Sequence, residues 1–170
     1  GILIPDPEPA SAGGLAPAGV REDLQRGDWT LECQVKLIDT GLSGYLFNYE
    51  TRFGPASRIA YRLQLSNNVP LLTAHSDDGF AYTITGNTLP TNEWIHLAAV
   101  WDSDANKLGL YIDGILYQGR TVAGGSAASF LYPATNQLAL AVSPDSSFVG
   151  SLLLDEVRIW GAPRSSDEIA

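Results

Sequence analysis

The chain has 170 residues, of which 45% are hydrophobic, and ten Lys and Arg against 19 Asp and Glu give a formal net charge of −9. This length and apolar content are typical of one folded domain and argue against intrinsic disorder. The negative charge repels phosphate backbones and disfavours nucleic acid as a partner. No run of about 18 apolar residues occurs, so no transmembrane helix or membrane insertion is predicted.

Residues 1–28 are rich in Pro, Ala and Gly and show no sustained hydrophobic period. Prolines at alternate positions from Pro5 to Pro9 favour extended backbone, and Gly13-Gly14 favours a loop. We interpret residues 1–28 as a linker and edge segment, and residues 29–170 as the folded domain. The first residues lack the basic region of a signal peptide. We therefore expect the sequence to be one part of a longer chain that contains neighbouring domains.

Strict alternation of apolar and polar residues predicts the first strand of the domain at residues 29–37. Its polar face consists of Thr30, Glu32, Gln34 and Lys36 and is predicted to be wet. Cys33 lies on the apolar face. As the only cysteine in the sequence it has no internal disulfide partner, and it fits a small buried apolar position.

Further short strands follow, separated by turns rich in Gly, Pro, Asn and Asp. Residues 58–65 alternate again, with Arg62 and Gln64 opposite an apolar face. Residues 93–101 are apolar at nearly every position, which is typical of a central strand covered on both faces. The remaining strands are predicted near residues 45–49, 71–75, 80–85, 107–112, 115–117, 137–142 and 148–160.

The spacing of these strands predicts the fold class. The Asp113-Gly114 step is a strong signal for a two-residue hairpin. No helical period occurs before residue 165, where a short helical turn begins. We predict an all-β, two-sheet antiparallel β-sandwich with a short C-terminal helical turn. In the closing strand, Val157, Ile159 and Trp160 are expected in the core.

Three ordered motifs resemble those of a known family. They are the closing strand Asp155-Glu-Val-Arg-Ile-Trp160, the central strand that begins Trp94-Ile-His96, and the hairpin Leu108-Gly-Leu-Tyr-Ile-Asp-Gly114. In chain order they run from the central strand through the hairpin to the closing strand, and together they resemble a laminin G-like (LamG-like jelly roll) domain of the concanavalin A-like lectin/glucanase superfamily. The resemblance implies a jelly roll over residues 29–169.

The resemblance also implies a calcium site, because relatives commonly place a structural calcium beside an aspartate of the last strand. Asp155 would be that ligand, with backbone carbonyls from the N-terminal segment. From the residues alone, Asp155 follows an apolar run where another apolar residue is expected. Two alternatives remain: the carboxylate accepts backbone N–H bonds, or it pairs with Arg158 or Arg21.

A second acidic run, Asp102-x-Asp104-x-Asn106, has the opening spacing of a calcium loop. Lys107 stands where such a loop needs glycine. The predicted strand that follows carries the last candidate ligand, Asp113, about 20 Å away, which is too far to close around one ion. Turn chemistry explains this run without a metal.

Catalytic motifs are not found in the sequence. The paired carboxylates of glucanases with this fold are missing, because Gln34 and Lys36 occupy the positions on the first strand where carboxylates would be needed. Of the two histidines, His96 lies in the central strand, where a hydrogen-bonded core residue is expected. We therefore expect a protein that is not an enzyme, and an unrecognised glycan-active enzyme is the alternative.

Ligand binding is the remaining function. Sugars are recognised by aromatic rings together with Asp, Asn and Arg side chains, commonly on loops. The predicted ligand-binding residues are Arg58, Asp77, Asp78 and Asp145, although Asp77 and Asp78 fit a solvated loop tip equally well.

The predicted function is a non-catalytic binding module of a larger extracellular protein. The expected ligand is a glycan or a partner protein, and the expected location is secreted or at a cell surface, in a bacterium. The alternative to binding is an architectural spacer in an adhesin or a toxin.

Overall fold

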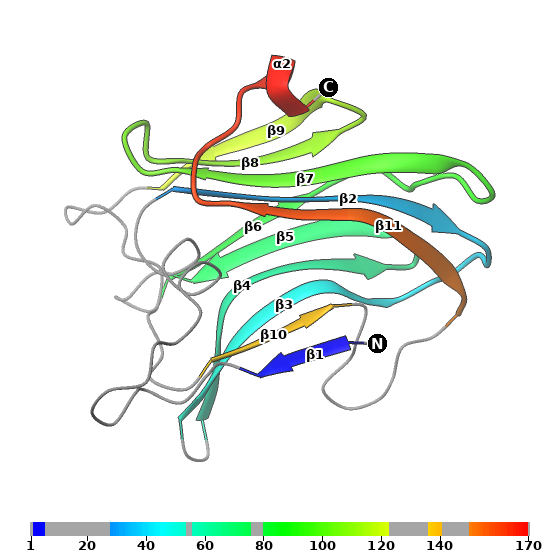
Figure 1. Ribbon diagram of the computed structural model, residues 1–170, viewed down its shortest axis with the longest axis horizontal. Helices are drawn as coiled ribbons and strands as arrows, with labels where there is room; N and C mark the ends of the chain where they lie inside the picture. The colour runs from blue at the N-terminus through cyan, green and yellow to red at the C-terminus, as the bar shows by residue number, and fades with distance from the viewer. Residues whose placement is uncertain are drawn as a thin grey trace.

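The computed structural model describes residues 2–5, 28–53, 56–75, 80–122, 136–140 and 150–169, with side chains for residues 28–49, 61–75, 80–122 and 150–169. The described residues form strands and one short helix (Figure 1). The elements are β1 (Ile2–Pro5), β2 (Trp29–Leu37), β3 (Gly44–Phe53), β4 (Ala56–Ser66), β5 (Val69–His75), β6 (Ala81–Thr85), β7 (Trp94–Asp102), β8 (Lys107–Ile112), β9 (Ile115–Thr121), β10 (Asn136–Leu140), β11 (Leu152–Trp160) and α2 (Ser166–Ile169).

The strands form two sheets that pack face to face (Figure 1). A six-stranded sheet has the order β1-β10-β3-β4-β5-β6, and a five-stranded sheet has the order β11-β2-β7-β8-β9. Neighbouring strands pair antiparallel throughout the described part. The predicted all-β sandwich with a short C-terminal helix is confirmed.

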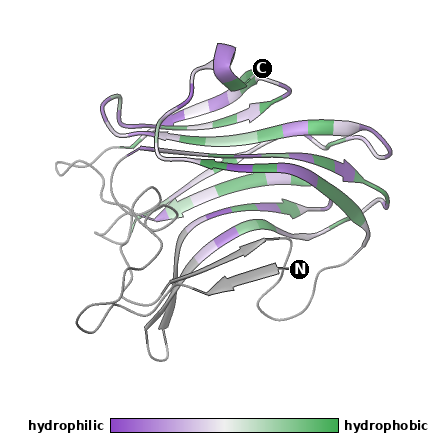
Figure 2. Ribbon diagram, in the orientation of Figure 1, coloured by the Kyte–Doolittle hydropathy of each residue, from purple (hydrophilic) through white to green (hydrophobic). Residues whose placement is uncertain are grey.

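The inner faces of the two sheets form one hydrophobic core. Figure 2 shows hydrophobic and hydrophilic residues alternating along the strands, as one-sided burial requires. Trp29 of the five-stranded sheet packs on Tyr61 of the six-stranded sheet, with ring centroids 4.6 Å apart. Tyr49 stacks on the same ring at 4.9 Å. The contact between Trp29 and Tyr61 joins the sheets across the core, and Tyr49 extends it along the six-stranded sheet.

Cys33 is buried in this core. Burial, and secondly the nearby Glu32 carboxylate, raises the pKa of Cys33 to about 12. The thiol therefore stays protonated at neutral pH and acts as a small apolar group, as the alternation predicted.

The central strand β7 is covered on both faces, as its apolar sequence predicted. Its inner face includes Leu97 and Trp101, which are buried in the core between the sheets. Its outer face includes Ala98 and Val100, which are buried against Ile169 of α2. The chain turns back after β11 to place this helix (Figure 1).

Two expectations about the outer surface of the five-stranded sheet are wrong. Thr30 and Glu32, predicted to be wet, are buried. Trp160, expected in the core, lies on the outer face and is 39% exposed, whereas Val157 and Ile159 do pack on the core. Thr30 and Glu32 are buried because the segment after β11 folds over this surface. Trp160 points outward because it follows the inward-facing Ile159 in the strand and pairs with Thr30 of the outer face.

Within the described ranges, no helix combines the length and the apolar character that crossing a membrane requires.

Candidate functional site

The outer face of the six-stranded sheet presents a row of polar side chains across four strands. Asn48, Arg62, Thr73 and Thr83 are successive Cα partners on β3, β4, β5 and β6. Partner residues in a sheet point to the same face. On β4, β5 and β6 the residues on either side of the row are buried in the core, so the row points outward. A second row beside it consists of Tyr45, Gln64, Leu71 and Thr85.

Arg62 lies at the centre of these rows with its guanidinium held in one orientation. Its Nε donates to Asn48 Oδ1 at 3.2 Å, and its Nη1 donates to Gln64 Oε1 at 3.1 Å. The guanidinium carbon lies 4.3 Å from the centroid of the Tyr45 ring, which is a cation–π distance. The guanidinium is therefore ordered before any ligand arrives.

Hydroxyl groups continue the row towards the sheet edge. The Oγ1 atoms of Thr73 and Thr83 lie 3.4 Å apart. At the edge, Arg120 of β9 donates from Nη1 to the Thr83 carbonyl oxygen at 3.0 Å, and its guanidinium lies 5.5 Å from the Tyr82 ring centroid. A second cation thus stands at the rim of this face.

The charge of this face differs from that of the whole chain. Although the chain carries a net charge of −9, none of the described side chains on the outer face of β3 to β6 is acidic. These side chains are Tyr45, Asn48, Arg62, Gln64, Ser66, Val69, Leu71, Thr73, His75, Ala81, Thr83 and Thr85. The local field at Arg62 is therefore not neutralised by a described carboxylate on the same face.

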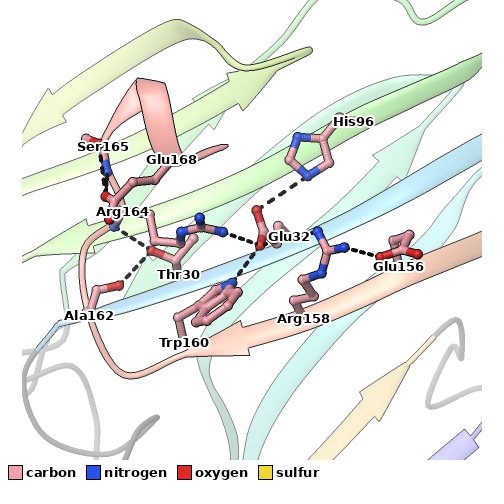
Figure 3. A network of polar contacts seen from close by, with 10 residues as sticks. All are labelled: Thr30, Glu32, His96, Glu156, Arg158, Trp160, Ala162, Arg164, Ser165 and Glu168. Atoms are coloured by element: carbon pink, nitrogen blue, oxygen red, sulfur yellow. Dashed lines mark hydrogen bonds and ion pairs between the residues drawn. The ribbon is translucent and has the colours of Figure 1, made fainter. Parts of the chain in front are cut away.

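The outer face of the five-stranded sheet is organised around the buried carboxylate of Glu32 (Figure 3). Its Oε1 accepts bonds from Trp160 Nε1 at 2.6 Å and from Arg164 Nη1 at 2.9 Å. Its Oε2 lies 3.4 Å from His96 Nε2, and Arg158 Nη1 lies 4.0 Å from Oε1. His96, expected in the core, thus lies on the outer face beside this carboxylate. The chain itself supplies the groups that surround Glu32.

The segment after Trp160 is fixed to the same surface. Thr30 Oγ1 donates to the Ala162 carbonyl oxygen at 2.8 Å and accepts from the Arg164 backbone N–H at 2.9 Å. The Arg164 guanidinium also lies 4.4 Å from the Trp160 ring centroid. These contacts hold the chain where α2 can begin.

A capping box starts α2. Glu168 Oε2 accepts from the Ser165 backbone N–H at 2.8 Å and from its hydroxyl at 2.9 Å. The backbone bond, and secondly the hydroxyl bond, lowers the pKa of Glu168 below its ordinary value of 4.5. Ile169 then buries its side chain against Ala98 and Val100. The network around Glu32 therefore anchors the C-terminal segment. Both oxygens of the Glu32 carboxylate already have neighbours within the chain.

Asp155 lies on β11 and is exposed on the outer face, opposite Gln34. Its Oδ1 accepts a bond from the Glu156 backbone N–H at 2.8 Å. Glu156 has a positive φ of 51° at an irregularity in the pairing of β11 with β2. Because Asp155 is exposed on the outer face, an apolar residue is not needed there. Its bond to a backbone N–H corresponds to one of the alternatives predicted for Asp155. Arg158 instead pairs with Glu156.

The described residues do not by themselves form a calcium site at Asp155. No group of three or more His, Cys, Asp or Glu side chains that could hold a metal occurs among the described residues. Calcium takes six to eight oxygen ligands, and one carboxylate supplies at most two. The N-terminal carbonyls that the resemblance implies lie largely outside the described residues, so calcium at Asp155 stays a prediction.

The predicted ligand-binding residues fall mostly outside the described part of the chain. Asp77, Asp78 and Asp145 lie outside the described residues. Arg58 lies in β4, where it pairs with Thr51, and its side chain is likewise outside the described residues. The structure thus neither brings these four together nor separates them.

The acidic turn at residues 102–106 shows turn chemistry, as expected. Asp102 Oδ1 accepts from the Ala105 backbone N–H at 2.8 Å. Asn106 has a φ of 51°, a conformation that asparagine tolerates better than most residues.

The polar row around Arg62 was not among the predicted site residues. Alternation in residues 58–65 did place Arg62 and Gln64 on a polar face. The sequence could not indicate Asn48, Thr73 and Thr83 as their neighbours, because strand order and register bring those residues together.

Comparison with protein families identifies the class of this fold. A family model, Laminin_G_3, described as the concanavalin A-like lectin/glucanases superfamily, matches residues 11–170. The chain therefore belongs to this family, and the resemblance noted in the sequence is confirmed. No curated protein sequence matches the chain significantly.

Solved structures of low sequence identity share the fold. The binding domain of Paraclostridial Mosquitocidal Protein 1 matches with a TM-score of 0.63 and 12% identity, over 84% of this chain and 36% of that one. The binding domain of botulinum neurotoxin serotype D matches with a TM-score of 0.61 and 13% identity, over 86% and 36%.

A third structure, described by the dependence of botulinum neurotoxin type C cell entry on two ganglioside molecules, matches with a TM-score of 0.58 and 12% identity, over 84% of this chain and 34% of that one. The chain spans about a third of the length of these structures.

Proposed function

We propose that this chain is a non-catalytic glycan-binding module, and that the glycan binds to the outer face of the six-stranded sheet. Arg62, Thr73 and Thr83 carry the proposal, because they are partly or fully exposed in this row. Asn48 is buried and serves to orient the Arg62 guanidinium. Guanidinium and hydroxyl groups are partners that sugar hydroxyls need, and here three neighbouring strands align them on one surface.

The shape of the row favours an oligosaccharide. Neighbouring strands lie about 4.8 Å apart, so the accessible part of the row, on β4, β5 and β6, is about 10 Å long. The ring of Tyr45 already carries the Arg62 guanidinium on one side. Recognition would therefore depend on hydrogen bonds along the row more than on aromatic stacking.

The module would work within a longer extracellular protein, secreted or at a cell surface. The similar solved structures support this proposal, because a fold like this one makes up about a third of larger toxin binding domains. We include a structural calcium at Asp155 in this proposal. Such an ion would link the N-terminal segment to β11.

A glycan array with the purified chain tests the function, with and without EDTA. We expect binding to a subset of oligosaccharides, and weaker binding by Thr73→Val and Thr83→Val, which remove one hydroxyl each at nearly constant volume. Thr40→Val is the matched control, because Thr40 is exposed in the turn between β2 and β3.

Two results would count against the proposal. If no glycan binds, protein recognition or a spacer role becomes the better interpretation. If a glycan binds but Thr73→Val and Thr83→Val match Thr40→Val, the binding surface lies elsewhere. Release of reducing sugar from a bound polysaccharide would contradict the non-catalytic assignment.

A further inference from the structure

The arginines with described side chains fall into two groups. On the five-stranded sheet, Arg158 pairs with Glu156 and Arg164 pairs with Glu32. On the six-stranded sheet and its rim, neither Arg62 nor Arg120 pairs with a carboxylate among the described residues. In a chain with 19 acidic and ten basic residues, an arginine without an acidic neighbour on its own face requires an explanation.

The contacts of Arg62 keep its charge available. A guanidinium has five N–H donors, and the bonds to Asn48 and Gln64 use two of them. The other three have no partner among the described residues. Both partners are neutral amides, so they orient the guanidinium without cancelling its positive charge. Stacking on Tyr45 restrains the plane of the group as well.

A guanidinium restrained in this way matches an anionic group. Arginine binds such groups through parallel N–H···O bonds, and less side-chain entropy is lost when the fork is already oriented. Arg120 adds a second positive charge at the rim, beside Thr83. Thr83 lies two strands from Arg62, about 10 Å at the usual strand spacing.

We propose that the outer face of the six-stranded sheet selects glycans that carry negatively charged groups, and that Arg62 is the residue that determines this specificity. The charged group is a carboxylate or a sulfate ester on a sugar ring, and Arg120 contacts a second such group along the same oligosaccharide. This inference rests on the proposed glycan-binding function.

Two matched pairs of oligosaccharides test the preference. The first pair is oligogalacturonate and its methyl ester, which share a backbone and differ in charge. The second pair is a sulfated galactose oligosaccharide and its unsulfated counterpart. Calorimetric titration should show at least about tenfold tighter binding for the charged member of one pair or both. Charge-assisted hydrogen bonds are stronger than neutral ones, and the difference in their free energies corresponds to about this factor in affinity. The pair that responds identifies the charged group.

Two variants of equal charge separate a local role of Arg62 from net charge. Arg62→Gln and Lys36→Gln each remove one positive charge, but Lys36 lies on the outer face of the other sheet. Arg62→Gln should lower the affinity for the charged glycan about tenfold, to that of its neutral partner, whereas Lys36→Gln should change it less than about twofold. Arg62→Lys keeps the charge and loses the fork, so it should recover only part of the affinity.

Arg120→Gln provides a test that does not depend on the fold of Arg62 variants. It should weaken binding of the charged member about threefold and leave the neutral member unchanged. Thermal unfolding of each variant checks the fold.

The outcomes distinguish the two proposals. If charged and neutral members bind equally well and Thr73→Val weakens both, the glycan site stands and the preference for negative charge is overturned. If Lys36→Gln weakens binding as much as Arg62→Gln, the role of Arg62 is overturned. If neither pair binds while the glycan array shows binding to neutral sugars only, the inference fails and the glycan-binding function stands. If the array is silent as well, both fail.

Discussion

The two outer faces of the sandwich each carry a charged residue near the middle. The two residues differ in burial and in whether a charge of opposite sign lies beside them. Glu32 on β2 is 1% exposed. Its Oε1 accepts from donors of β11 and the C-terminal segment, and its Oε2 lies beside His96 of β7. Arg62 on β4 is partly exposed and contacts only neutral side chains in the described part. Both residues stand on the polar face of an alternating strand.

This contrast separates a charged residue with a structural role from one that is available to a ligand. A buried ion is tolerated only when partners of the same chain compensate for the loss of water. Glu32 satisfies that condition, and the C-terminal segment is held in place as a result. Arg62 is ordered but not neutralised, which is the condition that an external anion needs.

The largest effect should come from removing the buried carboxylate. Glu32→Gln leaves the Arg164 guanidinium without its partner and should lower the free energy of unfolding by about 3 kcal/mol. Arg62→Gln should cost only about 1 kcal/mol, since neutral hydrogen bonds are lost. Urea unfolding of both variants measures the difference. Equal losses would mean that the two faces do not differ in the way described.

A smaller loss should follow from truncating the apolar contact of the C-terminal segment. Ile169→Ala removes most of a buried side chain that packs on Ala98 and Val100. It should cost about 2 kcal/mol, at the low end for such truncations because the cluster is small and peripheral. Urea unfolding with Ile38→Ala as an exposed control provides the measurement. If both variants unfold alike, Ile169 does not fix the segment to the sheet.

Calcium should stabilise the chain if Asp155 is a ligand. At a free concentration ten times the dissociation constant, a ligand that binds only the folded state adds about 1.4 kcal/mol. Thermal unfolding with calcium or with EDTA should show this increase, and Asp155→Ala should abolish it. Glu93→Ala, exposed beside β7, is the control. A calcium-dependent shift that survives Asp155→Ala would place the ion elsewhere.

The smallest effect concerns pH and the capping box. The pKa of Glu168 is lowered in the folded chain, so its ionised form contributes stability above the ordinary value of 4.5. That contribution should decline as the pH falls below 4.5 and through the folded-state pKa. The difference in stability between the native chain and Glu168→Gln should therefore shrink over this range. A difference that is constant from pH 7 to pH 3 would contradict the capping role.

The alternation of residues predicted much of the fold. The period of two in β2 and in the second half of β4 identified the residues that point inward, because a strand with one buried face must alternate. The Asp113-Gly114 step identified the hairpin between β8 and β9, whose turn residues both have positive φ values of 50° and 75°. These signals are local, so they can be read without knowing the neighbours of a strand.

The candidate site depended on contacts that the sequence does not contain. Arg62 and Gln64 were predicted on a polar face, but the row they form with Asn48, Thr73 and Thr83 needs the order and register of four strands. Sequence reasoning favoured residues in loops instead, where acidic clusters are conspicuous. A single alternating strand gives no sign of the strands beside it.

Local patterns in the sequence were enough to predict the sandwich, most inward-facing residues of the alternating strands and the hairpin at Asp113-Gly114. Which polar face is covered and which is accessible depends on contacts between segments far apart in the chain. Glu32 and its partner Trp160 are 128 residues apart in the chain, and the return of the C-terminal segment over β2 turns a predicted wet face into a buried one. Arg62 remains accessible because no described segment crosses it. Alternation fixes the face on which a side chain lies, whereas long-range packing decides what covers that face.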